Sequence, residues 1–185
     1  HRAFDLLLTD PPYGINFAGQ PTKWQRRAGQ APEQWDSMTS PEGLAFARTL
    51  CKYQIVWGGN YYDLPIARCW LSWHKPDAPP SMGNVEYAWT NFDQNSRMVS
   101  ASISATNPER VGHPTQKPEA VIRFALLQAP QDTRTVLDPF MGSGTTLVAA
   151  KRLGKAAVGI EINEAYCEIA AKRLSQGALP LEIGA

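Results

Sequence analysis

Short apolar runs alternate along this chain with segments of helical periodicity. The apolar runs predict strands at 4–9, 54–58, 69–73, 134–137 and 156–160, with a further strand at 85–90 and a weakly alternating hairpin arm at 98–106. The helical segments predict helices at 41–53, 60–66, 118–128, 147–153 and 163–176. Alternation of helices and apolar strands predicts an α/β protein, a three-layer sandwich around a mainly parallel sheet.

Capping signals support several of these helix boundaries. Thr39 and Glu42 have the spacing of a capping box, Pro118 is a good residue for a first helical turn, and Asn163 is a suitable N-cap. A long polar loop is expected between the first strand and the first helix, over 14–38.

Composition limits the classes of protein to consider. The length of 185 residues predicts one domain over 1–185. No apolar stretch approaches the ~18 residues of a membrane span, and no secretory leader is visible at the start. Cys51, Cys69 and Cys167 are widely spaced, which argues against a disulfide framework and favours a cytoplasmic protein. The three histidines lie at no metal-ligand spacing, so no metal site is expected.

The most informative motif follows the first strand as Asp10-Pro11-Pro12-Tyr13. In an open α/β sheet, ligands bind at the carboxyl ends of the strands. The Asp10 carboxylate and the Pro11 carbonyl can each accept one N–H of an exocyclic amine, while Tyr13 stacks on the ring that carries it. The alternative is an ordinary turn that ends the strand, because Asp and Pro are common turn residues.

A second motif lies in a predicted strand, turn, helix and strand over 134–160. The turn reads Asp138-Pro139-Phe140-Met141-Gly142-Ser143-Gly144-Thr145-Thr146, and Glu161 ends the second strand about 20 residues after the first glycine. Glycines let the backbone approach a ligand closely, and such an acid binds ribose hydroxyls. Leu147 replaces the third glycine of the dinucleotide fingerprint, and no lysine precedes Thr145, which argues against a phosphate loop.

With both motifs, the chain resembles the permuted (beta-class) DNA amino-methyltransferases that use S-adenosylmethionine. The resemblance covers nearly the whole chain, including Ile55 to Tyr62, Trp70 to Pro76, Val85 to Thr90 and the hexapeptide His113 to Pro118. It implies a Rossmann-like, seven-stranded methyltransferase sheet with permuted motif order, and catalysis by Asp10, Pro11, Pro12 and Tyr13. The cofactor residues it implies are Thr115, Lys117, Asp138, Phe140, Gly142, Ser143, Gly144, Thr145 and Glu161.

The resemblance also implies how the chemistry proceeds. Hydrogen bonds from both amino protons to Asp10 and Pro11 favour the pyramidal nitrogen whose lone pair attacks the methyl group. The target base must first leave the duplex, and it then stacks on Tyr13. Asp in the first motif position favours adenine N6, and cytosine N4 is the alternative. From another class, a catalytically silent subunit would keep the fold without the reaction, although intact Asp10 and Glu161 argue against this.

DNA contacts are expected to be local, because the net charge is only +1. The polar loop places Lys23, Trp24, Arg26 and Arg27 directly after the catalytic motif, where they can reach phosphates and bases. A solvated loop is the alternative. An inserted target-recognition segment is expected at about 76–112, with a plain hairpin at the sheet edge as the alternative. The sequence is compatible with a monomer and with a homodimer.

Overall fold

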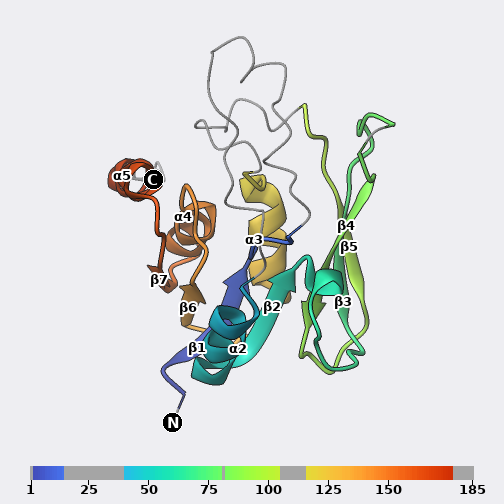
Figure 1. The fold of residues 1–185 in the computed structure, drawn as a ribbon, viewed down its shortest axis with the longest axis horizontal. Coiled ribbons are helices and arrows are strands. Elements are labelled where there is room, and N and C mark those ends of the chain that lie inside the picture. The colour runs from blue at the N-terminus through green and yellow to red at the C-terminus, as the bar shows by residue number, and fades with distance from the viewer. Residues whose placement is uncertain (1, 15–39, 81, 105–115, 177–185) are drawn as a thin grey trace, which may run out of the picture.

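A single sheet runs through the computed structural model of the protein, which describes residues 2–14, 40–80, 82–104 and 116–176. The sheet has seven strands in the order β5-β3-β4-β2-β1-β6-β7 (Figure 1). The strands are β1 Phe4–Thr9, β2 Cys51–Trp57, β3 Trp70–His74, β4 Val85–Thr90, β5 Arg97–Ser100, β6 Thr135–Asp138 and β7 Ala156–Gly159. The helices are α2 Pro41–Leu50, α3 Glu119–Gln128, α4 Thr145–Arg152 and α5 Glu164–Ser175, with the 3-10 turn η1 Gly59–Tyr61.

The sheet is mainly parallel, as predicted. β1 lies between β2 and β6 and is parallel to both, and β7 extends the parallel set beyond β6. Only β4 runs the other way among the described strands, since it pairs antiparallel with both β2 and β3. The carboxyl ends of β1, β2, β3 and β6 therefore meet at one edge of the sheet.

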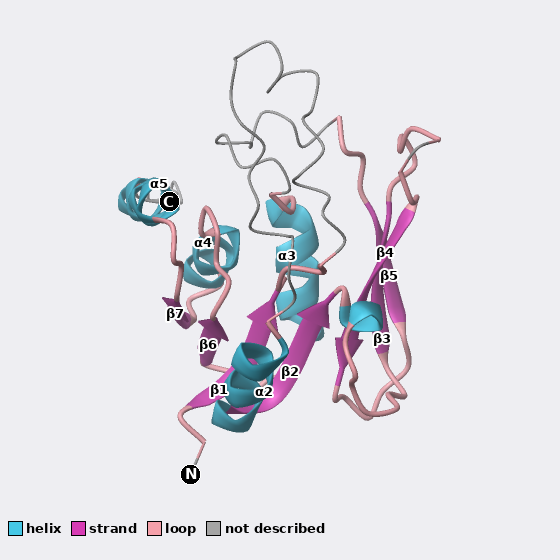
Figure 2. Cartoon of the chain, viewed as in Figure 1, coloured by secondary structure: helices cyan, strands magenta, loops and turns pink. Residues whose placement is uncertain are grey.

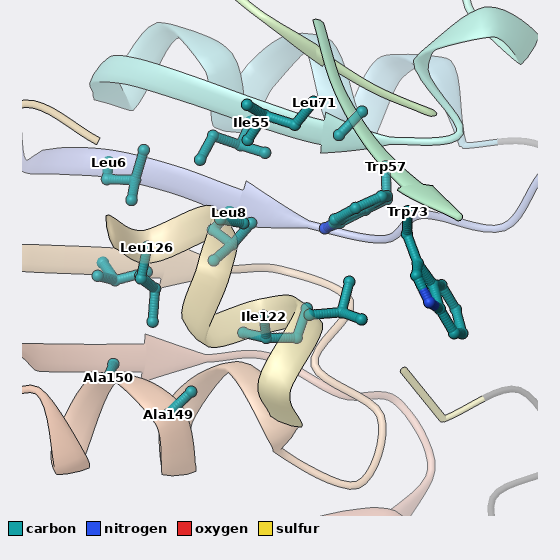
Figure 3. Packing of buried hydrophobic residues seen from close by; sticks show 14 of the residues in the cluster. Leu6, Leu8, Ile55, Trp57, Leu71, Trp73, Ile122, Leu126, Ala149 and Ala150 are labelled. Atoms are coloured by element: carbon teal, nitrogen blue, oxygen red, sulfur yellow. The ribbon is translucent and has the colours of Figure 1, made fainter. Parts of the chain in front are cut away.

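Helices cover both faces of this sheet, which gives the three layers of the predicted sandwich (Figure 2). Leu6 and Leu8 of β1 belong to the buried cluster that includes Leu126 of α3, on the face shown in Figure 3. Leu7, between them in sequence, packs instead with Leu44 of α2 on the opposite face. Alternate side chains of one strand thus enter two cores, which explains the three consecutive leucines at 6–8.

Five predicted strands, 4–9, 69–73, 85–90, 134–137 and 156–160, agree with the structure to within one residue. The strand predicted at 54–58 begins three residues earlier, and several helices and connections differ. The helix expected over 41–53 ends at Leu50, because Cys51 is extended and pairs with Phe4 as the first residue of β2. The helix expected at 60–66 is only the turn η1. Residues 97–100 pair parallel with β3 and are not hydrogen bonded to β4, so the predicted hairpin arm is wrong.

The helix-start signals have mixed outcomes. Asn163 is the N-cap of α5, where its side-chain oxygen accepts a hydrogen bond from the N–H of Ala165 at 3.0 Å. The N-cap of α2 is Ser40, and its side chain makes no capping bond. Thr39 of the expected capping box lies outside the described residues. Within the described part of the chain, no helix is long and apolar enough to cross a bilayer.

Side-chain hydrogen bonds fasten β1 to β6 at both ends. At the amino end, the Asp5 carboxylate accepts the N–H of Thr135 at 2.9 Å. At the carboxyl end, the Thr9 hydroxyl donates to Asp138 Oδ1 at 2.8 Å, and the N–H of Phe140 donates to the same oxygen at 3.2 Å. Asp138 is buried, and this burial raises its pKa to about 6.

We expect this buried carboxyl to make stability depend on pH. The folded state holds the Asp138 proton more tightly than the unfolded chain, where the pKa is 3.8, so the free energy of unfolding decreases as the pH rises from about 4 to about 6. Asp138→Asn keeps an oxygen acceptor and removes the ionisation. The variant should gain stability relative to wild type across this range, by at most ~3 kcal/mol.

Urea unfolding at intervals between pH 4 and pH 7 measures this difference. Asp132→Asn is the control, because Asp132 is exposed, pairs with Lys52 and has a lowered pKa. A difference between Asp138→Asn and wild type that is the same at every pH would show that Asp138 does not titrate in this range.

Candidate active site

The Asp10-Pro11-Pro12-Tyr13 motif leaves the carboxyl end of β1 and packs against the turn that follows β2. Gly58 in that turn has a φ of +64°, and a β-carbon built on it would overlap the Tyr13 ring. The ring of Tyr61, in η1, stacks on Tyr13 with centroids 4.8 Å apart and planes inclined by 16°. Parallel pairing of β1 with β2 thus places these aromatic rings at the predicted catalytic motif.

The carbonyl groups of the two prolines differ in their contacts. The Tyr62 hydroxyl donates to the Pro12 carbonyl at 2.5 Å. No donor from the described residues reaches the Pro11 carbonyl. The Pro11 carbonyl is therefore the one that can accept a hydrogen bond from a ligand, as the sequence predicts.

Asp10 is held by two donors from within the protein. Lys117 Nζ lies 2.5 Å from Asp10 Oδ2, and the Tyr13 hydroxyl donates to Asp10 Oδ1. Lys117 also donates to the Tyr13 oxygen at 3.2 Å. Lys117 of the hexapeptide thus reaches the predicted catalytic motif. The expected contact of Lys117 with the cofactor remains a prediction.

The same lysine joins a larger set of charges that the sequence analysis missed. Lys117 Nζ lies 3.2 Å from Glu86 Oε2, and Lys75 Nζ lies 2.8 Å from Glu86 Oε1. Lys75 directly follows β3, and Glu86 faces Trp73 across the antiparallel pair β3–β4. The sequence signal was an acidic residue in a strand pair rich in aromatic and apolar residues, which is uncommon without a partner of opposite charge. We call Asp10, Lys117, Glu86 and Lys75 the ion cluster.

Mutual attraction keeps Lys117 and Glu86 charged in the ion cluster. Burial by itself lowers the pKa of Lys117, but Asp10, Tyr13 and Glu86 outweigh it and raise that pKa well above its usual range. Burial likewise raises the pKa of Glu86, and the two lysines outweigh it and lower that pKa. Burial and the Asp10 charge raise the pKa of Tyr13, so its hydroxyl keeps its proton and donates to Asp10.

The glycine turn lies at the end of β6, the strand next to β1. Gly142 and Gly144 have φ values of +51° and +79°, and a β-carbon on Gly144 would press against Ala170 of α5. Glu161, beyond β7, accepts the N–H of Gly142 at 2.9 Å and that of Asn163 at 2.8 Å, on separate oxygens. The acid predicted to lie across this turn is therefore in contact with it.

Two of the hydroxyl side chains of the turn, those of Ser143 and Thr145, make internal contacts. Arg173 Nη1 donates to the Ser143 carbonyl at 2.6 Å and to the Thr145 hydroxyl at 3.1 Å. The Ser143 hydroxyl donates to Gln116 Oε1 at 3.3 Å. Gln116 and Arg173 were not predicted, and they support the turn from the hexapeptide and from α5. Asp138, buried against β1, supports the turn in the same way.

Several expected site residues lie outside the described part of the chain. They are Thr115 of the hexapeptide and the loop residues Lys23, Trp24, Arg26 and Arg27. Within the described ranges, no group of three or more His, Cys, Asp or Glu side chains could hold a metal ion.

Comparison with known proteins reveals relatives among DNA methylases. The family model for DNA methylases of the N6/N4 type matches residues 52–172. The type II methyltransferase M2.LlaDCHI of Lactococcus lactis subsp. cremoris is 50% identical over 226 residues, which cover 96% of this chain and 84% of the relative. M.HinfI of Haemophilus influenzae is 37% identical over 232 residues, which cover 95% of this chain and 64% of the relative.

Solved structures share the same fold. The M1.HpyAVI–SAM complex superposes with a TM-score of 0.57 at 21% identity, over 94% of this chain and 89% of that one. The cytosine-N4-specific PvuII DNA methyltransferase superposes with a TM-score of 0.61 at 18% identity, over 99% of this chain and 82% of that one. The sheet is thus the Rossmann-like sheet of DNA methyltransferases, and the chain belongs to the N6/N4 DNA methylase family.

Proposed function

We propose that this DNA methylase transfers a methyl group from S-adenosylmethionine to the N6 amine of an adenine that has been flipped out of the duplex. The observation that carries the proposal is the pair of acceptors at the end of β1, the Asp10 carboxylate and the Pro11 carbonyl. They lie one strand away from the glycine turn at the end of β6. An acceptor amine and a methyl donor bound at these adjacent strand ends would be neighbours.

Asp10 can accept the amine although two donors already hold it. Each carboxylate oxygen has two acceptor positions, and Lys117 and Tyr13 use one on each oxygen. The remaining positions and the Pro11 carbonyl can accept the two amino protons. Those bonds strengthen as the nitrogen becomes positive in the transition state, and Asp10 can then take the proton that leaves.

The glycine turn suits the cofactor of this family, S-adenosylmethionine, which supplies an activated methyl group. Glu161 holds one backbone donor on each oxygen and keeps one acceptor position on each. It can therefore bind two neighbouring ribose hydroxyls. Of the remaining predicted cofactor residues, we propose backbone contacts by Gly142, Ser143, Gly144 and Thr145, and ring packing by Phe140.

Adenine is the proposed target because the first motif residue is Asp, a tendency of adenine-specific relatives. Cytosine N4 is the alternative within the same family. Nucleosides from DNA incubated with the protein and isotope-labelled S-adenosylmethionine distinguish the two by mass spectrometry. N6-methyladenine is expected. N4-methylcytosine would establish the alternative, and absence of label from DNA would favour the silent subunit.

The proposed target recognition uses only part of the segment 76–112. β4 and β5 are strands of the sheet, so the connection after β3 and the chain after β5 are left to reach DNA. The Asp77 carboxylate joins these two stretches, because it accepts the Ser102 hydroxyl at 2.6 Å and the N–H of Ser104 at 2.8 Å. A cytoplasmic location is part of the proposal, supported by three free cysteines.

Asp10→Ala should abolish methyl transfer, because it removes the main acceptor of the amine. Cofactor affinity should stay within roughly tenfold of wild type, because the carboxylate serves chiefly the acceptor. Turnover with labelled cofactor and calorimetric titration of the cofactor measure the two effects. Near-normal turnover in this variant would contradict the proposed role of Asp10.

Glu161→Ala should instead weaken cofactor binding, by ~1–3 kcal/mol if it removes charge-assisted bonds to two hydroxyls. Calorimetry with S-adenosylmethionine measures the loss. Glu164→Ala is the matched control, because Glu164 is an exposed acid in the first turn of α5. Equal cofactor affinity for Glu161→Ala and wild type would be incompatible with a ribose contact.

Replacement of Lys23, Arg26 and Arg27 by Ala should reduce the salt dependence of DNA binding. If each side chain neutralises a phosphate, the slope of log affinity against log salt should flatten by about 2 to 3. Fluorescence anisotropy with labelled duplex DNA at several salt concentrations measures the slope. Cofactor affinity should not change. An unaltered slope would assign this loop to solvent.

A further inference from the structure

The Lys117 ammonium group makes its contacts among the described residues on the acceptor side of the site. A protonated lysine has three N–H donors. Two of them meet Asp10 Oδ2 at 2.5 Å and the Tyr13 oxygen at 3.2 Å, and the ammonium nitrogen also forms an ion pair with Glu86 Oε2 at 3.2 Å. These contacts direct the ammonium group toward Asp10 and its neighbours, whereas the family resemblance implies a role at the cofactor.

The surroundings of the ammonium group fix it in place. The Lys117 side chain is only 7% exposed, and its Nζ lies 5.3 Å from the centroid of the buried Trp57 ring. Glu86 is held in turn by Lys75, whose side chain is 4% exposed. Each charge of the ion cluster thus has a neighbour of opposite sign.

Burial of these charges argues for a functional role. In the other ion pairs of the described residues, Lys52–Asp132, Arg68–Asp93 and Arg152–Glu119, the cation is more than half exposed. Burying a lysine is costly, and well-packed apolar side chains often replace a buried ion pair without loss of stability. A purely structural contact would not need two buried lysines next to the catalytic motif.

We propose that Lys117 is a positioning residue for Asp10, and that Glu86, held by Lys75, sets the place of Lys117. The inference rests on the proposed function. Lys117 and the Tyr13 hydroxyl each bind one oxygen of the Asp10 carboxylate, which stops its rotation. The unused acceptor positions of both oxygens then keep a fixed direction before the amine arrives, so little reorganisation is needed during transfer.

Lys117→Gln is the first test, because glutamine removes the charge and shortens the reach to Asp10. We expect kcat to fall on the order of 100-fold, as for other small misplacements of reacting groups. The KM for DNA and the calorimetric Kd for S-adenosylmethionine should stay within about threefold of wild type. Lys117→Arg, which keeps charge and donors, should recover most of the lost turnover. Lys52→Gln, in an exposed pair, should change nothing.

Glu86→Gln tests whether Glu86 sets the place of Lys117. This test can be made even if the Lys117→Gln variant does not fold. No contact joins Glu86 to Asp10 among the described residues, so its effect reaches Asp10 through its ion pair with Lys117 or through its charge on Tyr13. We expect a smaller fall in kcat than for Lys117→Gln. In the double variant Lys117→Gln/Glu86→Gln the losses should be non-additive, because residues in one network couple.

Two outcomes would overturn the proposal. One is a Lys117→Gln variant that loses tenfold or more in cofactor affinity and keeps its kcat at saturating cofactor, since Lys117 would then bind the cofactor. The other is additive losses in the double variant. If the wild-type protein methylates no DNA amine, the proposed function is wrong, whatever the role of Lys117. The cofactor affinity of Lys117→Gln would still show whether Lys117 binds the cofactor.

Discussion

The pairing of β1 with β2 on one side and β6 on the other is the constraint on which the site depends. Parallel register brings the carboxyl ends of these strands together, so three connections distant in sequence share one edge of the sheet. The buried bond from Thr9 to Asp138 fastens this edge. If β1 shifted its register by one residue, Leu7 would point to the opposite face of the sheet, away from the core that it shares with Leu44. Asp10 would also move away from the turn after β2.

The fold could be predicted from the sequence where local pattern and burial agree. Residues 4–9 form a strand whose central leucines are buried on both faces, which the apolar run at 6–8 reveals. Asn163 caps α5 through a contact two residues away, which spacing also reveals. The helix expected over 41–53 stopped early because Cys51 pairs with Phe4, a contact between distant residues that local propensity does not contain.

The same distinction applies to the site. The predicted catalytic motif is one continuous stretch of sequence, and so is the glycine turn. The residue types within each stretch were therefore enough to predict an amine acceptor and a nucleotide site. The ion cluster joins Asp10 to Lys117, 107 residues apart, and adds Glu86 from a strand pair. Its members are ordinary charged residues, and only the packing of α3 and β4 around the end of β1 shows that they meet. Gln116 and Arg173 escaped prediction for the same reason.

The stack of Tyr13 on Tyr61 has a consequence for the choice of base. Rings with centroids 4.8 Å apart leave no room for a third ring between them, so a base that stacks on this face of Tyr13 must first displace Tyr61. It exchanges one aromatic contact for another, and the net gain is the difference between two stacking energies, each of ~1 kcal/mol or more. A large two-ring purine covers more of Tyr13 than a pyrimidine does. In the proposed reaction Tyr61 would therefore compete with the base for Tyr13, and a purine would displace it more readily than a pyrimidine would.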